Sequence, residues 1–252
     1  MIMRNFEDCI THNVREVAGD LQVKFNKGIP EGWEVKSLSD ICVLQSGYAF
    51  KSANFTDEKT KNVVVRMGNF RINNGLQFND NVKYLNNNIQ INEKFKLKKG
   101  DFLIVLSDVT RSGSIIGNVG IVPEDDKQYV LNQRVSKIKL PEKYYYYIYG
   151  VLSSVSFKNH CLSRADSATV LNLSNKDFYE YKLLFPPDCL VSDFSNKYKN
   201  YLLIAMKLTA VNQNLKETRD RLLTRLISGK LSVEDLDIQF PPSMTEQLEE
   251  IG

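Results

Sequence analysis

The pattern of hydrophobic and polar positions changes character at the paired prolines Pro186-Pro187. Upstream, between Val63 and Val122, short apolar and β-branched runs such as NVVV and FLIV alternate with stretches rich in Asn, Gly and Asp. Such runs are typical of strands separated by turns. The segment QYVLNQRVSKIKL predicts one further strand, and YEYKLLF predicts a last strand that the two prolines end.

Two segments show helical spacing instead. Pro141 is suited to the first turn of a helix, and the residues that follow it, through Leu162, keep a helical pattern. Their run of four tyrosines, Tyr144 to Tyr147, predicts a face packed on the sheet. After the two prolines a heptad pattern predicts one long helix over 191–229, roughly 55 Å at ~1.5 Å per residue.

The long helix carries one apolar seam at coiled-coil spacing, and eight of its ten positions are apolar or aromatic. A single helix cannot bury such a seam against itself, so the seam predicts a partner helix. Asn212 is a polar residue inside it, and Gly229 follows where a C-terminal cap is expected. The seam positions are Phe194, Tyr198, Tyr201, Ala205, Leu208, Asn212, Leu215, Arg219, Leu222 and Leu226.

These patterns together predict an α+β protein, in which a β-rich domain is followed by a long projecting coiled-coil helix. We expect an N-terminal extension over 1–27 with a short helix near 5–17, the β-rich domain over 28–190 and the helix over 191–229. The remaining residues, 230–252, are expected to form a flexible acidic tail.

Charge is distributed unevenly along the chain. The net charge is +3, but the segment 232–252 holds six acidic residues and no basic one, so the rest of the chain carries +9. A moderately basic body is compatible with a polyanionic partner such as DNA. An ordinary solvated surface would explain the same charge.

Signatures of an enzyme are absent from the sequence. It contains no P-loop pattern, only two histidines, and no C-x-x-C spacing among its four cysteines. The pair Glu34 and Lys36 is preceded by Glu31, which lies in a turn too close in sequence to complete a nuclease site, and no Asp/Asn-Pro-Pro-aromatic order suggests an amino-methyltransferase. We therefore expect no catalytic residue, no metal and no cofactor.

The cellular setting follows from cysteine usage and from the start of the chain. The four cysteines are scattered, which suits a reducing cytoplasm better than a disulfide framework. The first residues do not resemble a signal peptide, and no run approaches 18 consecutive apolar residues. A cytoplasmic protein without a membrane segment is expected.

Six motifs, in order along the chain, resemble the specificity subunit of type I restriction-modification systems. They are IPEGWEVKSLSDICVLQSGYAFKS, VVVRMGNF, KKGDFLIVLSDVTRSGSIIGNVGIV, LNQRV, LNLSNKDFYEYKLLFPP and LKETRDRLLTRLISGKLSV, and they cover about residues 27–233. The resemblance implies a target recognition domain that reads half of a bipartite DNA site, followed by a spacer helix. It also implies docking of methyltransferase and restriction subunits, without catalysis by the chain itself.

Members of that family usually carry two recognition domains and two helices, whereas this chain has one of each. The resemblance therefore implies a half subunit, which would pair with itself through antiparallel helices into a homodimer. The basic residues Arg219, Arg221 and Arg225 could face DNA phosphates or a partner subunit, or simply be solvated. One departure is Ser167, which stands where family members often have glycine.

Candidate DNA contacts follow from the chemistry of base edges and phosphates. Arg reads guanine, Asn and Gln read adenine, and Lys, Arg and Ser hold phosphates, all from loops or strand ends. These criteria select Tyr48, Lys51, Ser52, Arg66, Asn69, Arg71, Arg111, Ser112, Ser114, Gln133, Arg134, Arg164, Ser167 and Thr169. Structural roles remain open for some positions in these loops: Tyr48 and Phe50 could be core residues, Asn132 and Gln133 could pin a turn, and Ser112 could cap one.

Two other classes of function stay open from the sequence. One is a stand-alone DNA-modifying enzyme with an unrecognised active site. The other is a coiled-coil scaffold without affinity for DNA.

Overall fold

The structure is a computed structural model that describes residues 25–26, 29–78, 82–110, 112–165 and 170–230. It divides into two compact units, one through Lys199 and one from Asn200 onward. The predicted helix near 5–17 and the predicted acidic tail lie outside the described residues. Within the described residues, no helix is both long and apolar enough to cross a membrane.

The first unit is built on two sheets. One has four antiparallel strands in the order β11-β9-β13-β4, formed by Val119–Ile121, Phe102–Val105, Val135–Lys139 and Val43–Ser46. The other has five strands in the order β5-β7-β6-β12-β8, formed by Phe55–Thr56, Lys83–Leu85, Asn62–Val65, Gln128–Leu131 and Lys96–Leu97. Strands β6 and β12 pair in parallel, and the other pairs are antiparallel.

Three two-stranded sheets complete the strand set. β1 (Phe25–Asn26) pairs with β2 (Ile29–Pro30), and β10 (Ser107–Asp108) pairs with β14 (Leu171–Asn172). β3 (Glu34–Ser37) pairs with β15 (Lys182–Phe185), so two segments far apart in the sequence lie side by side.

Strand residues that alternate in the sequence face two different cores. Val63 and Val65 of β6 pack with Leu103 and Val105 of β9 in one cluster, so the two large sheets meet face to face. Val64 packs on the opposite side with residues that include Phe50 and Leu85. Because β6 is buried on both faces, it reads as a continuous apolar run rather than as an alternating one.

Helices cover the outer face of the four-stranded sheet. α2 (Tyr145–Leu152) packs on β9, where Phe102 meets the rings of Tyr145 and Tyr149 with centroids 5.4 Å and 5.2 Å apart. α3 (Val155–Arg164) follows directly, and α4 (Asn175–Tyr179) packs near it through Phe178 and Phe157. Of the tyrosine run, Tyr145 packs on Phe102 of β9, and Tyr144 and Tyr147 pack on Phe185 of β15. Short 3-10 turns occur at Leu38–Asp40, Ser52–Asn54, Met67–Asn69, Glu93–Phe95 and Glu142–Tyr144.

The structure corrects two predicted elements. QYVLNQRVSKIKL forms two strands, β12 and β13, in different sheets, because Arg134 adopts a left-handed conformation (φ 70°) that reverses the chain between them. The helical stretch after Pro141 breaks at Ser153-Ser154, where the Ser154 hydroxyl accepts a hydrogen bond from the Phe157 N–H (3.1 Å) and caps α3.

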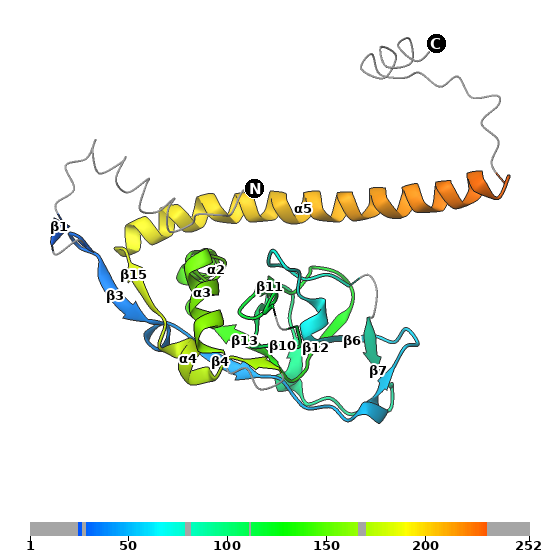
Figure 1. The fold of residues 1–252 in the computed structure, drawn as a ribbon, viewed down its shortest axis with the longest axis horizontal. Helices are drawn as coiled ribbons and strands as arrows, with labels where there is room; N and C mark the ends of the chain where they lie inside the picture. Colours follow the sequence, from blue (N-terminus) through cyan, green and yellow to red (C-terminus); the bar gives the residue numbers. More distant parts are fainter. Residues whose placement is uncertain (1–24, 27–28, 79–81, 111, 166–169, 231–252) are drawn as a thin grey trace, which may run out of the picture. The chain divides into compact units, whose positions relative to one another are not determined.

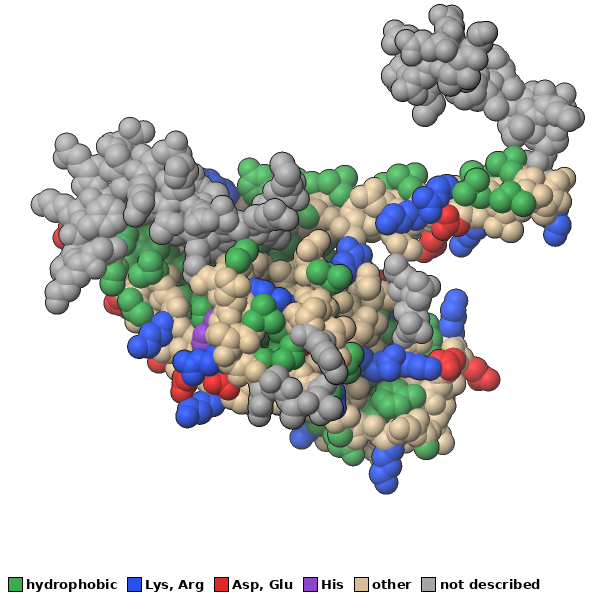
Figure 2. Space-filling view, viewed as in Figure 1, with side chains coloured by type: hydrophobic (Ala, Val, Ile, Leu, Met, Phe, Trp, Pro, Cys, Tyr) green, Lys and Arg blue, Asp and Glu red, His purple; other side chains and the backbone are tan. Residues whose placement is uncertain are grey.

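The long helix α5 spans Asp188–Ile227 and begins three residues before the predicted start. Its first part belongs to the first unit, where Phe194 and Tyr198 contact Tyr147 and Tyr149 of α2 with ring centroids 5.8 Å and 6.3 Å apart. These two seam positions therefore have an apolar partner inside the chain. In the second unit, the large apolar side chains of α5 are exposed, and Figure 2 shows them recurring along the helix. The α+β class with a long C-terminal helix is confirmed, as Figure 1 shows.

Candidate nucleic-acid interface

Four segments of the first unit meet at one edge of the sheets. β6 and β12 run parallel, so their carboxyl ends lie together, with Arg66 after one and the 132–134 turn after the other. Tyr48 joins them, because its N–H donates to the Leu131 carbonyl (3.1 Å) and its carbonyl accepts from the Gln133 N–H (2.9 Å). The fourth segment is attached through the Leu106 N–H, which donates to the Arg134 carbonyl (3.1 Å). We call this place the reading edge, defined by residues 47–52, 65–69, 106–110, 112–114 and 131–135.

Polar side chains at the reading edge are available to a ligand. Gln133 and Arg134 are exposed at the tip of their turn, Lys51 and Ser52 are exposed, and the Tyr48 side chain is 50% exposed. Phe50 is buried instead, and Asn132 is 93% buried within the turn. Tyr48 and Phe50 thus have different roles: Phe50 belongs to the core, and Tyr48 lies at the surface.

Gly47 shows how closely the segments pack. A Cβ at this position would lie 2.1 Å from the Asn132 carbonyl oxygen, so no side chain fits. The glycine allows the chain carrying Tyr48 to lie directly against the turn carrying Gln133 and Arg134.

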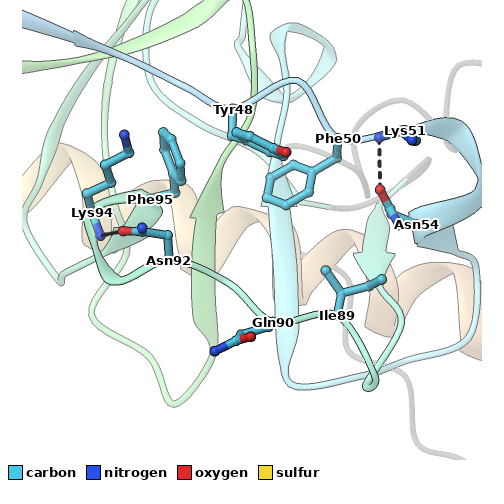
Figure 3. A pocket seen from close by; sticks show the side chains of 9 residues that line it. All are labelled: Tyr48, Phe50, Lys51, Asn54, Ile89, Gln90, Asn92, Lys94 and Phe95. Carbon is cyan, nitrogen blue, oxygen red and sulfur yellow. Dashed lines mark hydrogen bonds between the residues drawn. The ribbon is translucent and has the colours of Figure 1, made fainter.

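Beside Tyr48 lies a groove of about 560 Å³, drawn in Figure 3. Tyr48 and Phe95 have ring centroids 5.1 Å apart, and Lys51 and Lys94 also line the groove. The amides of Asn54, Gln90 and Asn92 line it as well, together with the apolar side chains of Phe50 and Ile89. Aromatic rings with amides and lysines provide stacking, base-edge hydrogen bonds and phosphate contacts.

Next to the turn, the side chains of Thr110, Ser112 and Ser114 bring three hydroxyl groups together in a cluster. Thr110 Oγ1 lies 3.1 Å from Ser112 Oγ and 3.3 Å from Ser114 Oγ. The buried carboxylate of Asp108 organises the loop by accepting hydrogen bonds from the Thr110 N–H and hydroxyl (both 2.7 Å) and from the Ile115 N–H (2.6 Å). Burial alone would raise the pKa of Asp108, but these donors outweigh it and hold the pKa below its usual value.

The structure changes the interpretation of several predicted contact residues. The Asn69 side chain is 3% exposed; its oxygen accepts from the Arg66 N–H (2.9 Å) and its amide donates to the Gln77 carbonyl (3.2 Å). Asn69 thus holds the 66–70 turn from inside, a structural role that the sequence prediction did not give it. Arg164 faces Asp177 and Glu180, with its Nη1 3.8 Å and 3.5 Å from their carboxylates. Arg71 lies outside the reading edge, on the neighbouring 71–75 turn.

Three predicted contact residues, Arg111, Ser167 and Thr169, lie outside the described residues. On the helix, Arg219 pairs with Asp220 (2.7 Å) and Arg221 with Glu217 (3.9 Å). On the face that Figure 2 shows, basic side chains are scattered among uncharged ones rather than gathered in one patch.

Sequence reasoning missed two sets of residues. Lys94, Asn92 and Gln90 join the groove only through the tertiary fold, although a Lys next to Phe95 in an Asn-rich loop is a signal of the expected chemistry. Asn118 and Lys158 lie beneath the exposed loops and have no local pattern in the sequence. In the described part of the chain, no cluster of three or more His, Cys, Asp or Glu side chains is arranged to hold a metal.

Comparison with known proteins gives a consistent family. A model described as "Type I restriction modification DNA specificity domain" matches residues 30–189. The specificity subunit of type I restriction enzyme EcoBI from Escherichia coli is 24% identical over 219 residues, covering 83% of this chain and 41% of the relative. The HindI subunit from Haemophilus influenzae is 25% identical over 209 residues, covering 81% and 42%.

Solved structures show the same fold. The type I restriction-modification S subunit from M. genitalium superposes with a TM-score of 0.54 at 17% identity, covering 82% of this chain and 48% of that one. A structure described in terms of assembly and conformational transition of the type I R-M system gives 0.52 at 15% identity, covering 88% and 49%. The chain spans less than half the length of the curated relatives named above.

Proposed function

Because the chain belongs to the family of type I restriction-modification DNA specificity domains, we propose that it reads one half of a bipartite DNA target and docks methyltransferase and restriction subunits on that site. The β-rich domain over 28–190 is the target recognition domain, and α5 is the spacer and dimerisation helix. The proposal gives the chain no catalytic step and leaves methylation and cleavage to the docked subunits.

The observation that carries the proposal is the convergence at the reading edge. Segments far apart in the sequence place Tyr48, Gln133 and Arg134 at the surface of one sheet edge, fixed by backbone hydrogen bonds. Gln and Arg are the side chains that form paired hydrogen bonds with adenine and guanine edges in the major groove. Lys51 and the hydroxyls of Ser112 and Ser114 suit phosphate contacts beside them.

Pairing of two identical chains would supply the second half of the reader. The exposed seam of α5 from Tyr201 to Leu226 suits burial against the same helix of a second copy. An antiparallel pair would set two recognition domains at a fixed separation along the duplex. One turn of the duplex is about 34 Å long, so both half-sites could be read from one side. This arrangement predicts a target whose two halves are inverted copies.

A selection from a random duplex library tests the proposal directly. We expect enrichment of a bipartite palindromic motif, with an affinity that falls steeply as salt rises. Gln133→Ala should reduce discrimination at one base position of the selected motif by about 1–3 kcal/mol. Lys176→Ala, which removes a charge from the exposed surface of α4, is the matched control and should leave the motif unchanged.

Two outcomes would overturn the proposal. Absence of any enriched motif, together with no salt-dependent binding, would favour a scaffold without affinity for DNA. Methylation or cleavage by the purified chain alone, with S-adenosylmethionine and Mg²⁺ added, would favour a stand-alone DNA-modifying enzyme.

A further inference from the structure

A half-buried lysine and a buried asparagine lie beneath the exposed loops. Lys158 extends from α3, and its Nζ donates to the carbonyls of Ser114 (3.0 Å) and Ile116 (2.7 Å) and to Asn118 Oδ1 (2.8 Å). An ammonium group has three N–H donors, so all three are used on the 112–118 segment.

Asn118 connects Lys158 to a second loop, the 71–75 turn. Its side chain is 3% exposed, and its Nδ2 donates to the carbonyls of Arg71 (2.7 Å) and Ile72 (2.9 Å). Because Lys158 only donates and backbone carbonyls only accept, the residue between them must do both, and this fixes the orientation of the Asn118 amide. Lys158 and Asn118 therefore tie α3, the 112–118 segment and the 71–75 turn into one network.

Further contacts fix both loops in place. The Asn74 side-chain oxygen accepts from the Val119 N–H (2.8 Å), and the Gly75 N–H donates to the Val119 carbonyl (2.7 Å). Gly117 lies directly on α3, where a Cβ would lie 2.5 Å from Cys161 Sγ. The two loops thus have little freedom to move relative to each other.

The exposed side of the network carries groups that suit a ligand. Ser112 is exposed, Ile72 is 69% exposed, and Arg71 is half-buried. Within the described part of the chain, Arg71 Nε is buried and has no hydrogen-bond acceptor. The network therefore holds polar and apolar side chains ready in a fixed arrangement.

Stability alone is a poor reason for placing a cation there. Withdrawing an ammonium group from water costs several kcal/mol, and a well-packed apolar side chain often holds a fold as well or better. A saturated polar network instead fixes one geometry, because any shift leaves a donor or acceptor unpaired.

We propose that Lys158 and Asn118 are positioning residues for DNA recognition, which hold the 71–75 turn and the 112–118 segment as a single rigid reading element. This inference rests on the proposed function. Preorganised loops bind without the free-energy cost of ordering, and they present their side chains to one DNA sequence better than to others.

Lys158→Met is the principal test, because methionine keeps most of the stem and removes the three donors. The affinities of the full chain for the library-selected duplex and for a scrambled duplex are measured at several salt concentrations. We expect the ratio of specific to non-specific affinity to fall roughly 5- to 150-fold, the range of a single lost base contact, while the salt dependence of non-specific binding stays unchanged.

Two further variants separate positioning from folding. Lys137→Met removes another half-buried cation, which pairs with Asp101 (2.6 Å) away from the network, and it should lower the unfolding midpoint but leave the specificity ratio intact. Asn118→Asp keeps the size and the bond to Lys158 but loses the donor to the 71–75 turn, so it should also lower the ratio. Asn118→Asp carries the test if Lys158→Met does not fold.

The outcomes distinguish this inference from the proposed function. If the wild-type chain selects a motif and both Lys158→Met and Asn118→Asp fold and keep the wild-type ratio, the positioning role is wrong. If the wild-type chain selects no motif, the proposed function fails first. A loss of ratio in Lys137→Met equal to that in Lys158→Met would also overturn the inference, because general destabilisation would then explain both.

Discussion

Apolar residues are buried in the recognition domain but exposed on the part of α5 that belongs to the second unit. In the recognition domain, Leu103 and Val130 are fully buried, and polar groups such as Asp108 and Asn118 are buried with hydrogen-bond partners. From Asn200 onward, Leu208 and Leu215 are 58% and 61% exposed. The first unit thus encloses its own core, whereas the second carries an exposed apolar stripe, formed by large apolar side chains between Tyr201 and Ile227.

This difference predicts which property a mutation in each region should change, folding stability or self-association. A core substitution in the recognition domain should act on folding, whatever the concentration of the chain. A substitution on the stripe should act on association and depend on concentration. The following predictions test that division, beginning with the largest expected effect.

Two leucine truncations compare the regions directly. Leu103→Ala removes a side chain between the two sheets and should cost about 2–5 kcal/mol of the free energy of unfolding. Leu208→Ala should change that free energy by less than about 0.5 kcal/mol but weaken self-association. Urea unfolding followed by the fluorescence of Trp33, the chain's single tryptophan, and sedimentation at several concentrations provide the two measurements. Equal losses of folding stability would contradict the division.

A pair of glycines tests the close packing of the reading edge. Gly47→Ala puts a Cβ into the Asn132 carbonyl and should cost about 1–3 kcal/mol, with a loss of sequence-specific binding. Gly68→Ala is the matched control, because no atom lies within 4 Å of the added Cβ. Thermal unfolding and duplex binding by both variants are the measurements. A Gly47→Ala chain that kept wild-type binding would show that the edge adapts.

These elements also show how far sequence reasoning reaches. Runs such as NVVV and FLIV, the stop at Pro186-Pro187 and the long helix were predicted because local periodicity and proline determine them. The break at Arg134 was missed because a left-handed arginine has no distinctive sequence signal. The roles of Asn69 and Lys158 were missed for a different reason: both depend on partners brought together only by the tertiary fold.

The free energy of unfolding should depend on pH in part through the titration of Lys158. Burial lowers the pKa of its ammonium group to about 8 from 10.5, while Cys161 and Asp108, which face it, act in the opposite direction. The native state then releases this proton near pH 8, whereas the unfolded chain keeps it. Because the unfolded state binds more protons, the free energy of unfolding should rise between pH 7 and 9. Above about pH 9 the trend should reverse, because burial raises the pKa of Cys42 and Cys161 to about 12.

Urea titrations at pH 7, 8 and 9 measure this slope, and Lys158→Met is the control that should remove it. A slope that persists in the variant would assign the effect to another group.

The smallest expected effect concerns Asn212 on the stripe. The exposed apolar residues of α5 include Ile204 and Val211 as well as the seam, so the stripe extends to both sides of the line through Leu208 and Leu215. If the partner helix packs on the predicted seam, Asn212 is buried there and disfavours other registers at a cost in stability. Asn212→Leu should then tighten self-association up to about tenfold, or ~1.4 kcal/mol, and blunt discrimination of half-site spacing. Val211→Ala is the counterpart on the other side of that line. If Val211→Ala weakens the dimer strongly while Asn212→Leu changes neither dimer strength nor spacing preference, the partner helix packs on the side of Val211. The predicted register is then wrong.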